Sequence, residues 1–149
     1  MPACSLRLYF VIGPRERPEK MYTKLIALGL QDKPFPLFEG SDKHLRSFTY
    51  VGGIVDGIVS VISNEAKVDG EIINLGTEVE HTTKDGIEAV EQVLGKSIAL
   101  NVIPKRPGDQ SRTKANIDKA RKLLNYDPKT TLLEAVQKQV DWYKANFTN

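Results

Sequence analysis

The sequence predicts a mixed α/β fold in which one layer of short strands is covered by helices, built as a single domain over residues 1–149. Short apolar runs rich in β-forming residues alternate with segments whose apolar residues recur at helical spacing. A chain of 149 residues has the length of about one domain. That length excludes a complete Rossmann domain joined to a substrate domain, and no G-x-G-x-x-G motif occurs.

The first elements are a buried strand and a helix, separated by a stiff loop. Residues 5–12 form a continuous apolar run that predicts a strand, and residues 13–18 form a loop with two prolines and three charges. Apolar residues at helical spacing predict a helix over 19–31. The prolines of residues 33–38 bias their predecessors away from helix, so this segment is expected to be extended.

The middle of the chain continues the same alternation. A strand over 46–51 precedes a helix over 53–64. This helix is predicted to be buried, because one broad face carries Ile54, Val55, Ile58, Val59 and Ile62. Residues 71–75 read as the next strand. The helix over 82–95 starts at a threonine that can cap it and closes at a glycine.

The last third adds one strand and two helices. Residues 98–103 form the strand, and residues 104–112 form a basic loop that contains a glycine. A helix over 116–124 comes next. The final helix begins at Thr131, whose hydroxyl can form a capping box with Glu134.

Composition limits the classes of partner. Lysine plus arginine number 21 and aspartate plus glutamate 19, so the net charge of +2 gives no basic excess for nucleic-acid binding. The single cysteine, Cys4, cannot form an internal disulfide and suits a reducing cytosol. No apolar run approaches the ~18 residues of a membrane span, and no signal-peptide pattern is present. We therefore expect a cytoplasmic protein without nucleic-acid or membrane partners.

Catalytic and metal-binding patterns are not visible in the sequence. The histidines, His44 and His81, have no Cys or Glu at metal-ligand spacing, so both are expected to be solvated loop residues. Cys4 has no local Cys–His signature. Neither a G-x-S-x-G nor a P-loop pattern occurs. The sequence thus predicts no metal ligand and no catalytic residue.

Two stiff basic loops are the main candidates for a binding site. Arg15 and Arg17 follow the first strand, Arg46 starts another strand, and residues 105–109 form a basic loop that ends in Asp109. Guanidinium groups suit phosphate or carboxylate recognition, and a neighbouring carboxylate could accept ribose hydroxyls. The alternative is that these are ordinary solvated surface charges.

Several strings resemble the C-terminal, substrate-binding half of NAD-dependent sugar-nucleotide epimerases and dehydratases of the extended short-chain dehydrogenase/reductase family. They lean toward UDP-glucuronate and UDP-glucose 4-epimerases. The longest string is L-R-L-Y-F-V-I-G-P-R-E-R-P at residues 6–18, similar to the family's L-R-x-F-x-V-Y-G-P-R-x-R-P. The others, in matching order, lie at residues 33–38, 46–51, 70–76, 106–109 and 125–132.

The resemblance implies a role for residues in both loops. Arg46 and Arg106 match arginines that grip the nucleotide diphosphate, and Asp109 matches the carboxylate that binds the ribose hydroxyls. Arg17 matches a loop arginine near the sugar, which faces the carboxylate in glucuronate-type enzymes.

The resemblance also implies a base-reading segment: the main chain around Pro36 and Phe38 matches the part that reads the uracil edge. The sequence departs from the family pattern at several positions, which are Ile12, Ser47, Gly52, Gly53 and Asn116. At two of them, Gly52 and Gly53 stand where the family has Asp-Asp, which removes a helix cap.

The machinery for hydride transfer is expected elsewhere. The family's cofactor loop and its Tyr-x-x-x-Lys pair lie upstream of the strand that corresponds to residues 5–12, the last strand of the dinucleotide-binding domain. None of the five tyrosines here has a lysine four residues later. No residue is therefore expected to bind NAD, the family's cofactor, or to act in catalysis.

Three functional hypotheses follow. The first is a truncated epimerase or dehydratase that binds UDP or a UDP-sugar weakly and does not turn it over. The second is a partner-binding or oligomerising module that reuses the lobe, with the edge of residues 5–12 favouring a homodimer. The third is one half of a split epimerase, completed by a separate chain with the Rossmann half.

Overall fold

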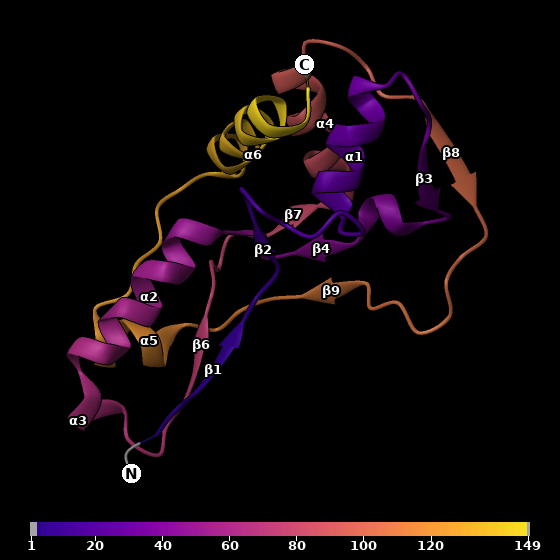
Figure 1. Cartoon of the computed structure of the whole chain (residues 1–149). Coiled ribbons are helices and arrows are strands. Elements are labelled where there is room, and N and C mark those ends of the chain that lie inside the picture. Colours follow the sequence, from indigo (N-terminus) through magenta and orange to yellow (C-terminus); the bar gives the residue numbers. More distant parts are fainter. Residues whose placement is uncertain (1–2, 149) are drawn as a thin grey trace.

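The computed structural model describes residues 3–148 and has a mixed α/β fold (Figure 1). The predicted fold class is confirmed, but the expected single layer of sheet is wrong. The described strands form three two-stranded sheets and one three-stranded sheet. Each strand has only two to four residues, which is too short for neighbouring sheets to merge into one layer.

The predicted strand over 5–12 is divided in two. β1 (Ser5–Leu8) pairs in parallel with β6 (Ile72–Leu75), whereas β2 (Val11–Ile12) pairs in parallel with β5 (Thr49–Tyr50). The break lies at Phe10, whose φ of 32° is incompatible with a continuous strand. The chain therefore changes sheets within one apolar run.

Two further strands lie at one side of the molecule, beside the first helix. α1 (Met21–Leu30) leads into β3 (Phe35–Phe38), which is the extended segment that the prolines predict. β3 pairs in parallel with β8 (Leu100–Ile103), so the predicted strand over 98–103 begins two residues later than expected.

The three-stranded sheet is assembled from short pieces. β4 (Leu45–Arg46) lies at its centre, with β7 (His81–Thr82) antiparallel on one side and β9 (Arg112–Thr113) parallel on the other. The predicted strand over 46–51 is therefore two strands in different sheets, β4 and β5. β9 begins at Arg112, the last residue of the predicted loop over 104–112, and is not predicted as a strand.

Two helices carry the predicted caps. α4 (Thr83–Leu94) and α6 (Leu132–Phe147) each begin with a capping box, formed by Thr82 with Asp85 and by Thr131 with Glu134. Gly95 ends α4 in the left-handed conformation, with a φ of 72°. Both boxes and the glycine stop confirm the predictions.

Like α1, three further α-helices begin without a side-chain cap. They are α2 (Val51–Ser63), the four-residue α3 (Glu65–Val68) and α5 (Asp118–Leu124). α2 follows β5 directly and spans the segment predicted as a helix over 53–64. A short 3-10 helix, η1 (Ser41–Lys43), precedes β4. Within residues 3–148, no helix is long and apolar enough to cross a membrane.

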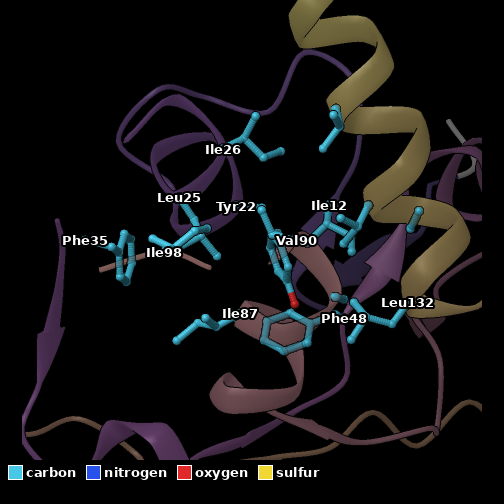
Figure 2. Packing of buried hydrophobic residues seen from close by; sticks show 14 of the residues in the cluster. Ile12, Tyr22, Leu25, Ile26, Phe35, Phe48, Ile87, Val90, Ile98 and Leu132 are labelled. Carbon is cyan, nitrogen blue, oxygen red and sulfur yellow. The ribbon is translucent and has the colours of Figure 1, made fainter. Parts of the chain in front are cut away.

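The buried apolar residues form two clusters. The first cluster joins α1, α4 and α6 and includes Tyr22, Leu25, Val90 and Val136 (Figure 2). The second cluster lies between the β1–β6 pair and the helices α2 and α5, with Ile73 at its centre. Together the two clusters are the core of the described chain.

The predicted burial of the broad apolar face of α2 is wrong for four of its five residues. Ile54 is buried in the second cluster, and Gly57 contacts Leu75. The other four residues of this face, spaced i, i+3, i+4 and i+7, are between 37% and 73% exposed; we call them the α2 stripe: Val55, Ile58, Val59 and Ile62. α2 thus has one broad apolar face, of which the chain covers only the side that includes Ile54.

Candidate functional site

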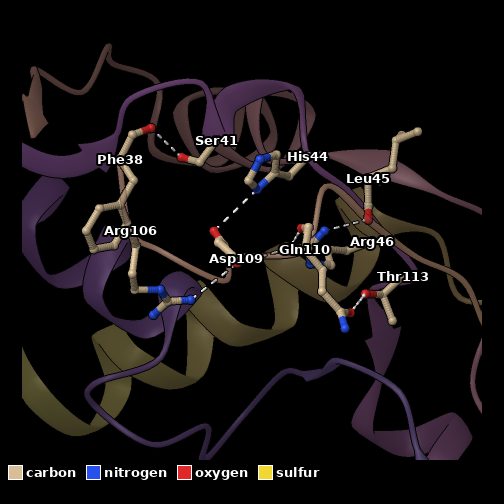
Figure 3. Close-up of polar contacts among 9 residues, drawn as sticks. All are labelled: Phe38, Ser41, His44, Leu45, Arg46, Arg106, Asp109, Gln110 and Thr113. Carbon is tan, nitrogen blue, oxygen red and sulfur yellow. Dashed lines mark hydrogen bonds and ion pairs between the residues drawn. The ribbon is translucent and has the colours of Figure 1, made fainter. Parts of the chain in front are cut away.

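A carboxylate lies at the centre of a cluster of cationic side chains (Figure 3). Asp109 Oδ1 accepts hydrogen bonds from Nη2 of Arg46 at 3.4 Å and from Nη2 of Arg106 at 3.3 Å. The other oxygen, Oδ2, lies 3.3 Å from Nδ1 of His44. Arg46 and Asp109 are 63 positions apart in sequence, so the fold itself assembles this group.

Arg46 is the buried member of the cluster. Its side chain lies in β4 and donates to the carbonyls of Leu45, at 2.9 Å, and of Gln110. The guanidinium carbon also lies 5.3 Å from the centre of the Phe10 ring. Because these bonds tie β4 to the loop that holds Asp109, Arg46 positions the loop as well as supplying charge.

Arg106 is the exposed member. Its side chain is 60% exposed and packs over the Phe38 ring, with 5.4 Å between the guanidinium carbon and the ring centre. The ring and Asp109 hold the guanidinium in place while much of it faces solvent. This arrangement leaves Arg106 able to meet an anion.

The β3 main chain lies next to this cluster. Phe35 and Glu39 donate to carbonyls of the β8 segment, at 2.8 and 2.9 Å. Because alternate residues of a strand turn their main-chain groups to opposite edges, the Pro36 carbonyl and the Phe38 N–H face away from β8. The Phe38 carbonyl accepts the hydroxyl of Ser41 at 2.7 Å.

Arg17 does not join the cluster. Its Nε lies 3.2 Å from Glu19, and its side chain is exposed. Arg17 lines a separate cavity of about 500 Å³ with Arg15 and Lys20, and Phe10 is also part of the wall. Since Arg46 packs on the Phe10 ring, this aromatic side chain connects the cavity with the Asp109 cluster.

A buried glutamine fixes the loop that carries Arg17. Gln139 of α6 accepts a hydrogen bond from the Gly13 N–H at 3.0 Å and donates to Glu16 at 2.9 Å and to Thr23 at 3.0 Å. Glu16 also accepts the Thr23 N–H at 2.9 Å. The conformation of this basic loop is therefore set from the first cluster, through α1 and α6.

An ion pair holds β9, which follows the Asp109 loop. Arg112 donates from Nε and Nη2 to the two oxygens of Glu80, each at 2.7 Å. These hydrogen bonds lower the pKa of the Glu80 carboxyl and raise that of Arg112. The pair joins the start of β9 to the segment before β7 and so braces the sheet on which Arg46 lies.

The role of His44 is not visible in the sequence. The expectation of a solvated loop residue is wrong, because the His44 side chain is only 13% exposed and contacts Asp109. The only local signal is that His44 lies two positions before Arg46. His81 is half-buried in β7. Among residues 3–148, no group of three or more His, Cys, Asp or Glu could hold a metal ion.

Comparison with known proteins identifies the family. The sequence pattern of the GDP-mannose 4,6 dehydratase family matches residues 1–139. The chain belongs to this family. It corresponds to the C-terminal portion of NAD-dependent sugar-nucleotide epimerases and dehydratases of the extended short-chain dehydrogenase/reductase group, as the sequence resemblance predicts.

Individual family members match nearly the whole chain. An uncharacterized UDP-glucose epimerase of Bacillus subtilis, YtcB, is 34% identical over 99% of this chain and 46% of its own length. The UDP-glucuronate 4-epimerase of Thermodesulfobacterium geofontis is 31% identical over 95% and 43%. The chain thus spans slightly less than half of these relatives.

A solved structure of the family has the same fold. The UDP-glucuronic acid 4-epimerase of Bacillus cereus, in complex with UDP-glucuronic acid and NAD, aligns with a TM-score of 0.93 at 33% identity. The alignment covers 99% of this chain and 46% of that protein.

The family implies the cofactor NAD, whose phosphates need an open glycine-rich turn at the start of a helix. At the start of α2, a Cβ on Gly52 would overlap the Tyr50 ring, and one on Gly53 would lie 3.2 Å from Pro128 Cβ. Both glycines face side chains of the protein rather than open space. The residues at this turn therefore do not fit a dinucleotide.

Proposed function

We propose that this chain is the sugar-nucleotide-binding portion of an NAD-dependent epimerase or dehydratase and that it binds UDP or a UDP-sugar at the Asp109 cluster. The observation that carries the proposal is the meeting of Arg46, Arg106 and Asp109, which come from distant segments. Two guanidinium groups beside one carboxylate suit a diphosphate attached to a ribose.

Each part of the nucleotide has a partner in this proposal. Arg106 and Arg46 bind the diphosphate, and Asp109 accepts the ribose hydroxyls. The Pro36 carbonyl and the Phe38 N–H provide one acceptor and one donor, which complements the uracil edge. UDP-glucuronic acid in the Bacillus cereus epimerase supports this ligand class.

The sugar is proposed to lie on the far side of Phe10. There Arg17 lines the cavity of about 500 Å³, together with Arg15 and Lys20. A cationic wall suits a sugar carboxylate, so a UDP-hexuronic acid is the favoured ligand. The exposed pair with Glu19 must open for Arg17 to bind it, which costs little because exposed ion pairs are weak.

The proposal assigns no catalytic residue and no cofactor site to this chain. None of its tyrosines has a lysine four residues later, and the glycines that start α2 are packed against side chains. We place the protein in the cytoplasm, where its single cysteine, Cys4, is compatible with reducing conditions.

UDP titration followed by amide chemical shifts tests the proposal. We expect shifts at Phe38, Arg46 and Asp109 and a Kd no tighter than about high micromolar, near −5 to −6 kcal/mol. Arg106→Ala should weaken binding about tenfold or more, because hydrogen bonds to charged groups are worth about 1.5–3 kcal/mol. The control Lys119→Ala, which only breaks an exposed pair with Glu71, should change nothing. An absence of amide shift changes at millimolar UDP would overturn the proposal.

A second candidate function, partner binding, is favoured by the α2 stripe. Four exposed aliphatic residues on one helix face are typical of a surface that packs against another protein. The proposed partner is a separate chain that carries the dinucleotide-binding half of the family. A second copy of this chain is the alternative, and light scattering of the purified protein at high micromolar concentration distinguishes the two.

A further inference from the structure

We propose that His44 is a positioning residue: it holds the Asp109 carboxylate in the orientation that recognises ribose. The inference rests on the proposed nucleotide-binding function and adds a residue that the family motifs do not assign. Nδ1 of His44 lies 3.3 Å from Oδ2 of Asp109, and the two side chains are only 13% and 16% exposed. The contact is therefore largely shielded from solvent.

The two oxygens of Asp109 have different partners. Oδ1 accepts from both arginines, whereas Oδ2 contacts only His44 among the described polar groups. A carboxylate has about four lone-pair sites, so Oδ2 keeps a site for a hydroxyl group beside the imidazole. When a diphosphate draws the exposed Arg106 away, the His44 contact remains on the other oxygen and keeps the carboxylate plane fixed.

Two hydrogen bonds hold the main chain of His44 in place. Its N–H donates to the Ser41 carbonyl at 3.0 Å, and its carbonyl accepts the Thr83 N–H at the start of α4, also at 3.0 Å. His44 thus joins η1, β4 and α4 at one point. Figure 3 shows the imidazole of His44, anchored in this way, directed at the Asp109 carboxylate of the neighbouring loop.

The chemistry requires a proton on Nδ1. With that proton, His44 donates to Oδ2 and leaves the carboxylate oxygen's second lone pair for a ribose hydroxyl. Without a donor at position 44, Asp109 can rotate to present both oxygens to the Arg46 and Arg106 guanidinium groups. The carboxylate would then bind the arginines more fully and the ribose less well.

Nucleotide binding by three variants tests this role. UDP and 2′-deoxy-UDP are titrated into the wild type, His44→Ala and His44→Gln. We expect the wild type to prefer UDP by about tenfold, the effect of one hydrogen bond to a charged group. His44→Ala should reduce that preference to within about twofold, mainly by weakening UDP. His44→Gln keeps a side-chain donor and should restore most of the preference.

The outcomes separate this inference from the proposed function. If His44→Ala weakens both nucleotides equally and keeps their ratio, His44 only supports the fold and the inference is overturned. If the wild type binds neither nucleotide, the proposed function fails and the inference fails with it.

A nitrogen NMR spectrum of the wild-type imidazole gives an independent readout that needs no variant. A proton on Nδ1 supports the role of His44, and a neutral ring with its proton on Nε2 alone contradicts it.

Discussion

The two apolar clusters differ in how completely the chain covers them. The first cluster is enclosed by α1, α4 and α6, and its member Phe48 packs against Phe10, the ring that Arg46 of the Asp109 cluster contacts. The second cluster is covered on one side by α2 and α5, but α2 then presents the α2 stripe to solvent. The candidate site is therefore built on the region that the chain encloses by itself.

Among the described helices, capping boxes occur only in the first cluster, although α1 of that cluster begins at Lys20 without one. α4 and α6, which pack in the first cluster, begin with capping boxes, whereas α2 and α5 begin at Tyr50 and Ile117 without a side-chain cap. Most of the stability of a protein helix comes from packing of its apolar face. α2 therefore depends on packing contacts more than α4 does, and much of its apolar face, the α2 stripe, is exposed in the described chain.

One pair of identical substitutions should separate the two regions most strongly. Ile26 is fully buried in the first cluster, and Ile62 of the α2 stripe is 73% exposed. Ile26→Ala should lower the free energy of unfolding by about 2–5 kcal/mol, because it leaves a cavity. Ile62→Ala should change it by less than about 0.5 kcal/mol. Equal losses in urea unfolding would show that the α2 stripe is covered in solution.

The buried glutamine of α6 gives the next largest effect. Gln139→Leu leaves the Gly13 N–H without its partner and removes one hydrogen bond each from Glu16 and Thr23, which keep their bonds to each other. A buried donor left unsatisfied costs about 1–3 kcal/mol. We expect destabilisation and a mobile basic loop, seen as faster amide exchange at Arg15 and Glu16.

The control for this substitution lies on the exposed side of the same helix. The Gln137 side chain bonds to Asp141 in the next turn, so Gln137→Leu should leave the free energy of unfolding and the amide exchange of the basic loop unchanged. If Gln139→Leu had no more effect than Gln137→Leu, the basic loop would not be held from α6.

The local signals of the first cluster are readable in the sequence. Thr82, Thr131 and Gly95 are correctly predicted because capping depends on neighbouring residues. The division of the first strand at Phe10 is not predictable, since the apolar run continues through it. β9 exists only because β4 lies beside it, which no local pattern encodes.

In the candidate site, too, residue types are visible in the sequence, whereas contacts between distant segments are not. The arginines of the two basic loops stand out by residue type, and the fold brings Arg46 and Arg106 to one carboxylate. The separation of Arg17 from them and the contact between His44 and Asp109 depend on tertiary packing. A histidine next to a charged loop gives no local sign of the partner 65 positions away.

The α2 stripe should affect association more than folding. Replacing Ile58 and Ile62 together by serine removes apolar surface that is already partly in water, so the unfolding free energy should change by only about 1 kcal/mol or less. If the α2 stripe binds a partner or a second copy, the same double variant should abolish that complex in light scattering. A complex that survives the double variant would assign the interface to another surface, such as the edge of β1.

The smallest effect that we expect is a loss of stability in acid, caused by the capped helices of the first cluster, α4 and α6. The backbone N–H of Thr131 bonds to Glu134 and lowers the pKa of that carboxyl from its ordinary value of 4.5, and Thr82 lowers that of Asp85 in the same way. A lowered pKa contributes stability that is present above the ordinary pKa and is lost as pH falls through the folded-state pKa. Thermal unfolding of the wild type should therefore occur at lower temperature as pH falls below about 4.

Glu134→Gln and Asp85→Asn should each flatten this dependence while keeping a hydrogen-bond acceptor at the cap. If both variants lost stability on acidification as steeply as the wild type, the pH dependence would lie outside α4 and α6, and the caps would not distinguish the two regions.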